Sequence, residues 1–127
     1  MNKQKISEAE WRVMEIIWSN ENILASDIAA QLEEMNWSIQ TIKTLLSRLV
    51  NKNIISFKKE GKAYSYYSLL SREECVKKER ENFIYKVFRG SKQEFLTNFI
   101  KSESFTKGEI EELRKLINEK GEKSGLY

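Results

Sequence analysis

The chain has 127 residues, 40% of them hydrophobic and 32% charged, which suits one or two compact units with a buried core. With no proline and only five glycines, it favours helices joined by short turns over a fold made mainly of strands. It has no histidine, and its single cysteine, Cys75, cannot form an internal disulfide. No apolar run approaches the roughly 20 residues that span a bilayer, and the N-terminal residues lack the apolar stretch of a signal peptide. We therefore expect a cytoplasmic protein with no metal, no cofactor and no membrane insertion.

The net charge of +3 is unevenly distributed along the chain. Residues 1–35 carry three basic and seven acidic side chains, whereas residues 36–62 carry six basic side chains and one acidic one. A local basic block in a nearly neutral chain is typical of a surface that contacts phosphates. A solvated, lysine-rich face is the alternative explanation.

The first third of the chain predicts two short helices. Residues Ser7–Glu10 have the serine-x-x-glutamate spacing of a capping box, and the apolar stripe after them predicts a helix to near Asn20. Residues 23–25 are predicted to be extended. Ser26 is the expected N-cap of a second helix, which ends near Met35.

A third helix is predicted from the cap Ser38 to about Lys52. Four apolar residues at i, i+3, i+4 and i+7 form its inner stripe: Ile42, Leu45, Leu46 and Leu49. Its outer face is polar and cationic and holds no carboxylate: Gln40, Thr41, Lys43, Thr44, Ser47, Arg48 and Asn51. A helix exposed only to water usually mixes both signs of charge, so this face predicts a binding surface.

Two β-rich runs, residues 54–59 and 63–69, flank the turn Glu60–Lys62 and predict a hairpin. Three helices followed by a lysine-tipped hairpin indicate a winged helix-turn-helix over residues 1–70, with the third helix in the major groove and the hairpin along the DNA backbone. The predicted DNA-binding residues are Ser38, Gln40, Thr41, Lys43, Thr44, Ser47, Arg48, Asn51, Lys58, Lys59 and Lys62.

The side chains of the third helix match the chemistry of base edges. The amides of Gln40 and Asn51 donate and accept, as adenine requires, and Thr44 suits a thymine methyl group. Lys43 and Arg48 suit guanine acceptors or phosphates, and the sequence leaves these two options open. The hairpin lysines predict salt-sensitive, sequence-independent affinity.

From Ser71 onward the sequence predicts narrow amphipathic helices, so the expected fold is mainly α with a small β-hairpin wing. Residues 71–120 are too few to bury a stable core alone, which predicts a helical domain that pairs with a second copy of the chain. Residues 121–127 are predicted to be a frayed tail. The residues expected to contribute to the dimer are Val76, Phe83, Ile84, Val87, Phe88, Phe95, Leu96, Phe99, Ile100, Ile110, Leu113 and Ile117.

An enzyme is not expected. Cys75 has no histidine to activate it, the carboxylate pairs lie on polar helix faces, and no glycine-rich phosphate loop occurs. A DNA-binding repressor is the favoured hypothesis. A winged-helix module that binds a protein instead of DNA is the alternative, because a fold does not determine a function.

Several segments resemble the BlaI/MecI penicillinase-repressor family of bacterial transcription regulators: ISEAEWRVMEIIW, ASDIAAQL, WSIQTIKTLLSRLVNKNII and KKEGKAYSYYSL, followed by ENFIYKVFRG, FLTNFIKSE and EIEELRKLI. The most specific motif is W-S-x-x-T-I-x-T-L-L-x-R-L around the third-helix cap. The resemblance implies a homodimer that binds palindromic operators and represses resistance genes.

In the best-known members of this family, a membrane β-lactam sensor triggers proteolysis of the repressor at an Asn-Phe bond. The matching bond in this chain is Asn98–Phe99, which makes a sensor protease an expected partner. The family's copper-responsive branch carries paired cysteines as metal ligands. This chain has only Cys75, so we do not expect it to sense a metal.

Overall fold

The computed structural model describes residues 5–123, and the chain divides into two compact units, residues 1–83 and 84–127. The elements of the first unit are α1 (Glu8–Trp18), β1 (Ile23–Leu24), α2 (Ala25–Gln31), the 3-10 turn η1 (Glu33–Met35), α3 (Ile39–Asn51), β2 (Ile55–Glu60) and β3 (Ala63–Ser68). Then come α4 (Arg72–Phe88), α5 (Lys92–Ser102) and α6 (Lys107–Lys123). The boundary between the units lies inside α4.

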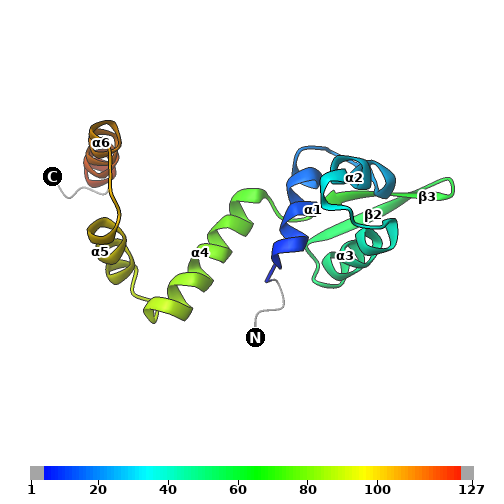
Figure 1. The fold of residues 1–127 in the computed structure, drawn as a ribbon, viewed down its shortest axis with the longest axis horizontal. Helices are drawn as coiled ribbons and strands as arrows, with labels where there is room; N and C mark the ends of the chain where they lie inside the picture. The colour runs from blue at the N-terminus through cyan, green and yellow to red at the C-terminus, as the bar shows by residue number, and fades with distance from the viewer. Residues whose placement is uncertain (1–4, 124–127) are drawn as a thin grey trace. The chain divides into compact units, whose positions relative to one another are not determined.

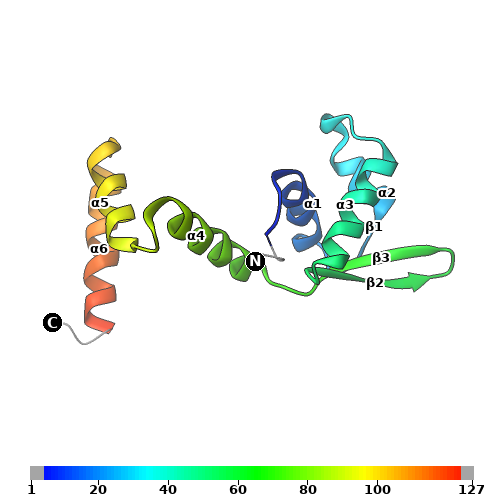
Figure 2. The ribbon, with the colours of Figure 1, turned by 90° about the horizontal axis from the view of Figure 1, so that it is seen from below.

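The three strands form an antiparallel sheet in the order β1-β3-β2. Strands β2 and β3 make the predicted hairpin, which projects beyond the helices of this unit (Figures 1 and 2). Gly61 stands in its two-residue turn with φ 65°, a conformation that glycine adopts without strain. The short extended piece near residue 23 is a third strand, because Ile23 and Leu24 pair with Tyr66 and Ser65.

The core of the first unit lies between α1, α2, α3 and the sheet. The inner stripe predicted for α3 is buried, with Leu45 5% exposed and Ile42, Leu46 and Leu49 fully enclosed. The other buried hydrophobic residues are Ile6, Val13, Met14, Ile17, Ile23, Ile28, Leu32, Ile54, Ile55 and Cys75. Because α3 is buried along only one stripe, the side chains on its opposite face remain exposed to solvent.

Local capping explains where most helices begin. The capping box at α1 is confirmed: Ser7 Oγ accepts from the backbone N–H of Glu10, and Glu10 Oε1 accepts from that of Ser7. The predicted N-cap at Ser26 is wrong. Helix α2 begins at Ala25 after Leu24, which makes no side-chain cap, because pairing of Leu24 in the sheet sets the start of the helix. The helix also ends earlier than Met35, and η1 completes the segment.

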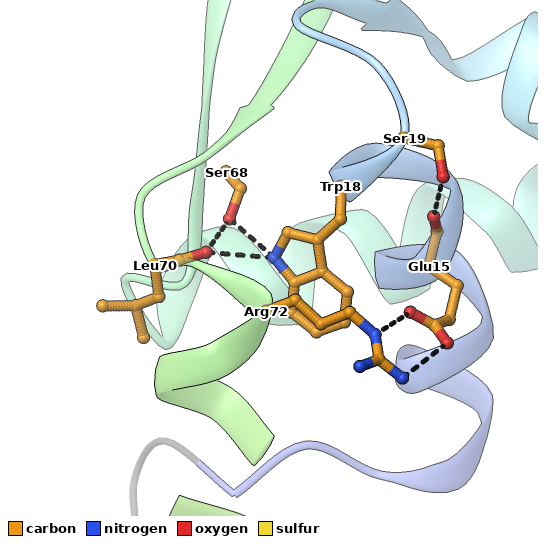
Figure 3. A network of polar contacts seen from close by, with 6 residues as sticks. All are labelled: Glu15, Trp18, Ser19, Ser68, Leu70 and Arg72. Atoms are coloured by element: carbon orange, nitrogen blue, oxygen red, sulfur yellow. Dashed lines mark hydrogen bonds and ion pairs between the residues drawn. The ribbon is translucent and has the colours of Figure 1, made fainter. Parts of the chain in front are cut away.

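The connection from β3 to α4 is held against α1 by side-chain contacts (Figure 3). The indole N–H of Trp18 donates to Ser68 Oγ at 3.2 Å and to the carbonyl of Leu70 at 3.0 Å, and Ser68 Oγ donates to the same carbonyl. Arg72, the first residue of α4, pairs with Glu15 at 2.8 Å. One turn further on, Cys75 is 4% exposed and belongs to the core cluster. The first turn of α4 is therefore part of the winged-helix unit.

The second unit consists of the end of α4 with α5 and α6. Helix α4 ends at Phe88, and Arg89 and Gly90 follow at φ 52° and 84°. Ring contacts connect four phenylalanines of this unit in series: Phe88, Phe95, Phe99 and Phe105. At the start of α6, the Thr106 hydroxyl group accepts from the backbone N–H of Glu109, and the Glu109 carboxylate accepts from that of Thr106.

The expected frayed tail is wrong for residues 121–123, because α6 continues to Lys123 and Gly121 is buried. Residues 124–127 lie outside the described part of the chain. No helix within residues 5–123 is both long and apolar enough to cross a bilayer.

Candidate nucleic-acid interface

Helix α3 presents its polar face to solvent in the first unit. All seven residues of the predicted face are exposed: Gln40, Thr41, Lys43, Thr44, Ser47, Arg48 and Asn51. No carboxylate lies within the helix. Among residues 5–123, neither Lys43 nor Arg48 has an ion-pair partner. The face therefore carries uncompensated positive charge beside amide and hydroxyl groups.

Some hydroxyl groups of this face already serve the helix itself. Ser38 Oγ accepts from the backbone N–H of Thr41 at 3.1 Å, and the two hydroxyl groups lie 3.1 Å apart. Thr44 Oγ1 donates to the carbonyl of Gln40 at 3.0 Å. The Thr44 proton is thus engaged, while its methyl group and oxygen lone pairs stay available to a partner.

The helical repeat separates the two cations of α3. At about 100° per residue, Gln40, Thr44, Ser47 and Asn51 form a central row. Lys43 lies on one flank, one turn after Ile39, and Arg48 lies on the other flank beside Thr41, about 140° around the helix from Lys43. Lys43 and Arg48 therefore face different neighbours.

The register of the hairpin separates its two strand lysines. Lys59 pairs with Tyr64, and Phe57 pairs with Tyr66, so these four residues share one face of the sheet. Lys58 pairs with Ser65 on the opposite face, and its ammonium lies 5.5 Å from the centre of the Tyr67 ring. The sequence predicted Lys58 and Lys59 as one group, but the structure places them on opposite faces of the hairpin.

A cleft connects α3 with the hairpin. Lys43 and Lys62 both line it, although 18 residues separate them in the chain. Its other lining residues are Leu24, Ala25, Ser26, Ile39, Ala63, Tyr64 and Tyr66, so its lining holds no carboxylate. Ser26, Tyr64 and Tyr66 were not predicted as site residues, because only the folded chain brings these hydroxyl groups into one cleft with the two lysines.

One member of the basic block is used inside the protein. Lys52 Nζ lies 2.6 Å from Glu10 Oε1 and also donates to the carbonyl of Lys5 at 2.8 Å. Glu10 is 1% exposed. Burial alone would raise the pKa of Glu10, but the hydrogen bonds from Lys52 and Ser7 and the charge of Lys52 outweigh it, so the pKa lies below its usual value. Counting charges along the sequence therefore overstates the positive charge of the outer surface by one.

The residues expected to form a dimer lie on α4, α5 and α6, and many are unusually exposed for hydrophobic side chains. Phe83, Val87, Leu96, Phe99, Ile100, Ile110 and Ile117 are between 43% and 63% exposed. Val76, Ile84, Phe88, Phe95 and Leu113 are half-buried. Asn98 and Phe99, the predicted cleavage residues, lie within α5 and are both exposed.

Known proteins resemble the chain over nearly its whole length. Residues 6–119 match the family model described as "Penicillinase repressor". The methicillin resistance regulatory protein MecI of Staphylococcus aureus is 40% identical over 117 residues, which are 91% of this chain and 95% of MecI. The penicillinase repressor of the same species is 37% identical over 120 residues, or 93% and 95% of the two chains.

The winged-helix region also matches a solved structure, that of the DNA-binding domain of the repressor BlaI, at 32% identity and a TM-score of 0.52. The match covers 56% of this chain and 88% of the BlaI domain. The expected fold class, mainly helical with a small sheet, is confirmed. The chain belongs to the penicillinase repressor family, which consists of transcriptional repressors and not of enzymes.

Proposed function

We propose that the protein is a homodimeric repressor that binds a palindromic operator of antibiotic-resistance genes, with α3 reading the major groove and the hairpin following the backbone. One observation supports the DNA-binding surface most directly. The exposed face of α3 has amides, hydroxyl groups and cations without an ion-pair partner in residues 5–123, but it has no carboxylate. Amides and cations recognise base edges and phosphates, whereas a carboxylate there would repel the DNA backbone. A module that binds a protein would expose a mixed or apolar face at this place, so the DNA-binding function is favoured.

The test is a titration of the full-length protein against its own upstream DNA at two salt concentrations. We expect saturable binding to one palindromic fragment in the presence of excess nonspecific DNA, with weaker binding at higher salt. Arg48→Ala should weaken binding. If Arg48 contacts a phosphate in each of the two half-sites, the variant should also reduce the slope of log K against log salt by about two.

Arg12→Ala is the matched control, because Arg12 is an exposed cation of the same unit that lies on α1 beside Glu15 and Glu79. It should leave operator affinity unchanged. Equal losses in both variants would show that only net charge matters and would contradict the docking of α3. Absence of any preference over random DNA at both salts would refute the function.

The dimer is proposed from the burial pattern of the second unit. Among residues 84–123, no hydrophobic side chain is buried, although α5 and α6 both carry apolar stripes. An exposed apolar surface of this kind costs free energy in water and is removed when a second copy covers it. Two linked winged helices then bind two half-sites together, centred about 10 base pairs or a multiple apart.

We further propose that induction cuts the Asn98–Phe99 bond through a sensor protease. This bond lies inside α5, where the carbonyl of Phe99 accepts from the backbone N–H of Glu103, so the helix must unwind before a protease can hold it in an extended form. With 11 residues, α5 is shorter than the roughly 12–15 residues at which isolated helices become marginally stable. Cleavage would divide the apolar surface that makes the dimer.

Mass spectrometry of the repressor from induced cells tests the cleavage. Two fragments meeting between Asn98 and Phe99 support it, and Phe99→Ala should lengthen the lifetime of the intact chain. Full derepression with an intact chain would contradict it.

A further inference from the structure

The cleft between α3 and the hairpin gathers positive charge and hydroxyl groups from two helices and the hairpin. Lys43 comes from α3, Lys62 from the hairpin turn, Tyr64 and Tyr66 from β3, and Ser26 from α2. Neither lysine has an ion-pair partner within residues 5–123. Two like charges facing one cleft without a carboxylate repel one another, and an anion placed between them removes that cost.

The hydroxyl group of Tyr66 remains a hydrogen-bond donor under physiological conditions. Burial, with Tyr64 beside it, raises the pKa of Tyr66 above its usual value of 10.0. Tyr64 is 44% exposed and stands on the same sheet face as Tyr66. Hydroxyl and ammonium groups are donors that proteins use to hold a DNA phosphate.

We propose that this cleft holds a single backbone phosphate in each half-site, bound by Lys43 and Lys62 together, with the Tyr64 hydroxyl as an additional donor. The proposal rests on the DNA-binding function above and assigns Lys43 to the backbone and not to a base. The position of Lys43 supports this assignment, because it lies on the flank of α3 that faces the hairpin. Base reading is then left to the central row that begins at Gln40, and to Arg48 on the other flank.

A phosphate held from both sides would also fix the hairpin relative to α3. The tip of the hairpin projects beyond the helices of this unit (Figure 2). Lys62 lies in the turn at that tip. A shared phosphate therefore sets the depth at which α3 enters the groove, and Lys62 acts as a positioning residue for base reading.

Neutral phosphate substitution tests the proposal. The probe is a set of duplexes carrying the upstream operator, each with one phosphate replaced by an uncharged methylphosphonate, titrated with the full-length protein. For the unsubstituted protein we expect one position in each half-site where neutralisation weakens binding roughly tenfold. For Lys43→Ala and Lys62→Ala, neutralisation at that same position should weaken binding only roughly threefold, because one of the two lysines remains, and for the double variant it should change affinity less than roughly twofold.

Two controls make the result specific. Arg48→Ala and Lys58→Ala should keep the roughly tenfold effect at that position, since Arg48 lies on the opposite flank of α3 and Lys58 on the opposite face of the hairpin. Tyr64→Phe removes only the hydroxyl group, and it should make the loss of affinity on neutralising that phosphate roughly two- to fivefold smaller. Lys43→Ala should also weaken operator and random DNA by the same factor, leaving their ratio unchanged.

Three outcomes would overturn the proposal. Lys43→Ala and Lys62→Ala could lose sensitivity at different phosphates, or could both keep it everywhere. Lys43→Ala could relax the preference for one base pair, which would make Lys43 a base-reading residue. If the unsubstituted protein shows no preference for the operator at all, the DNA-binding function itself is refuted. If it prefers the operator but gives one of the other outcomes, only the proposed phosphate site in the cleft is refuted.

Discussion

Removing Lys52 should destabilise the winged-helix unit, although this lysine lies at the end of α3, the helix proposed to bind DNA. Glu10 is 1% exposed, and its carboxylate accepts from Lys52 Nζ at 2.6 Å and from the backbone N–H of Ser7 at 2.8 Å. Breaking a fully buried pair by removing one partner costs about 3–5 kcal/mol. The Lys52 side chain is 28% exposed, so water replaces part of the interaction, and we expect Lys52→Met to lower the free energy of unfolding by about 2–3 kcal/mol.

Urea denaturation of the full-length protein at one fixed concentration, followed by circular dichroism, measures this loss. Lys77→Met is the matched control, since Lys77 is exposed on α4, and should change stability by less than about 0.5 kcal/mol. The double variant Lys52→Met with Glu10→Gln should recover at least about 1 kcal/mol, because a neutral amide no longer leaves a buried charge unpaired.

The pH dependence of the free energy of unfolding is an independent test of the Glu10–Lys52 pair. The pKa of Glu10 is lowered in the folded protein, so the pair contributes stability above the usual value of 4.5 and loses it as the pH falls through the folded pKa. Without Lys52, burial dominates and raises the pKa of Glu10. At low pH, protonation of Glu10 then removes the unpaired buried charge that destabilises the variant. The difference between Lys52→Met and the unsubstituted protein should therefore shrink below pH 4.5. A loss under about 0.5 kcal/mol near neutral pH, or one that is independent of pH, would refute this reasoning.

Trp18→Phe should cost about 1–2 kcal/mol in urea denaturation, because Ser68 and Leu70 lose their shared indole donor. Trp37→Phe is the control, since within residues 5–123 its indole makes no hydrogen bond, and equal losses would contradict the role of the donor. Ile117→Asp should be a monomer in sedimentation at micromolar protein if the proposed dimer forms through α6, because Ile117 is 63% exposed on this helix. Asn118→Asp adds the same charge on the same helix and should remain a dimer; a dimer in both variants would place the contact elsewhere. Burial, and secondarily Glu74, raises the pKa of Cys75, so a thiol reagent should modify the native chain on the order of a hundredfold more slowly than the urea-unfolded chain.

The features that the sequence predicted correctly are those set by neighbouring residues. The capping box at Ser7, the buried stripe of α3 and the turn at Gly61 each depend on a few consecutive positions, so periodicity and residue type were sufficient. The start of α2 was missed because a long-range strand pairing, Leu24 with Ser65, overrides the local preference of Ser26 for a cap.

The candidate site was predicted in the same uneven way. The exposed face of α3 follows from helical periodicity once its buried stripe is known. The cleft does not, because Lys43 and Tyr64 meet only after the hairpin folds back, and Lys52 is withdrawn from the surface by a partner 42 positions earlier in the chain. The separation of Lys58 and Lys59 follows from the alternation of side chains along β2, so the predicted hairpin already implied it, although the two lysines were grouped together.

The contacts of Trp18 and Arg72 determine where the DNA-binding unit can be separated from the rest of the chain. A fragment that stops at residue 70 lacks Arg72, the partner of Glu15, and Cys75, which fills part of the core. Such a fragment would expose apolar surface on α1 that the whole chain covers. Fragments or chimeric repressors should therefore keep the first turns of α4 with the winged helix, and exchange between relatives should transfer Glu15, Trp18 and residues 68–75 as one set.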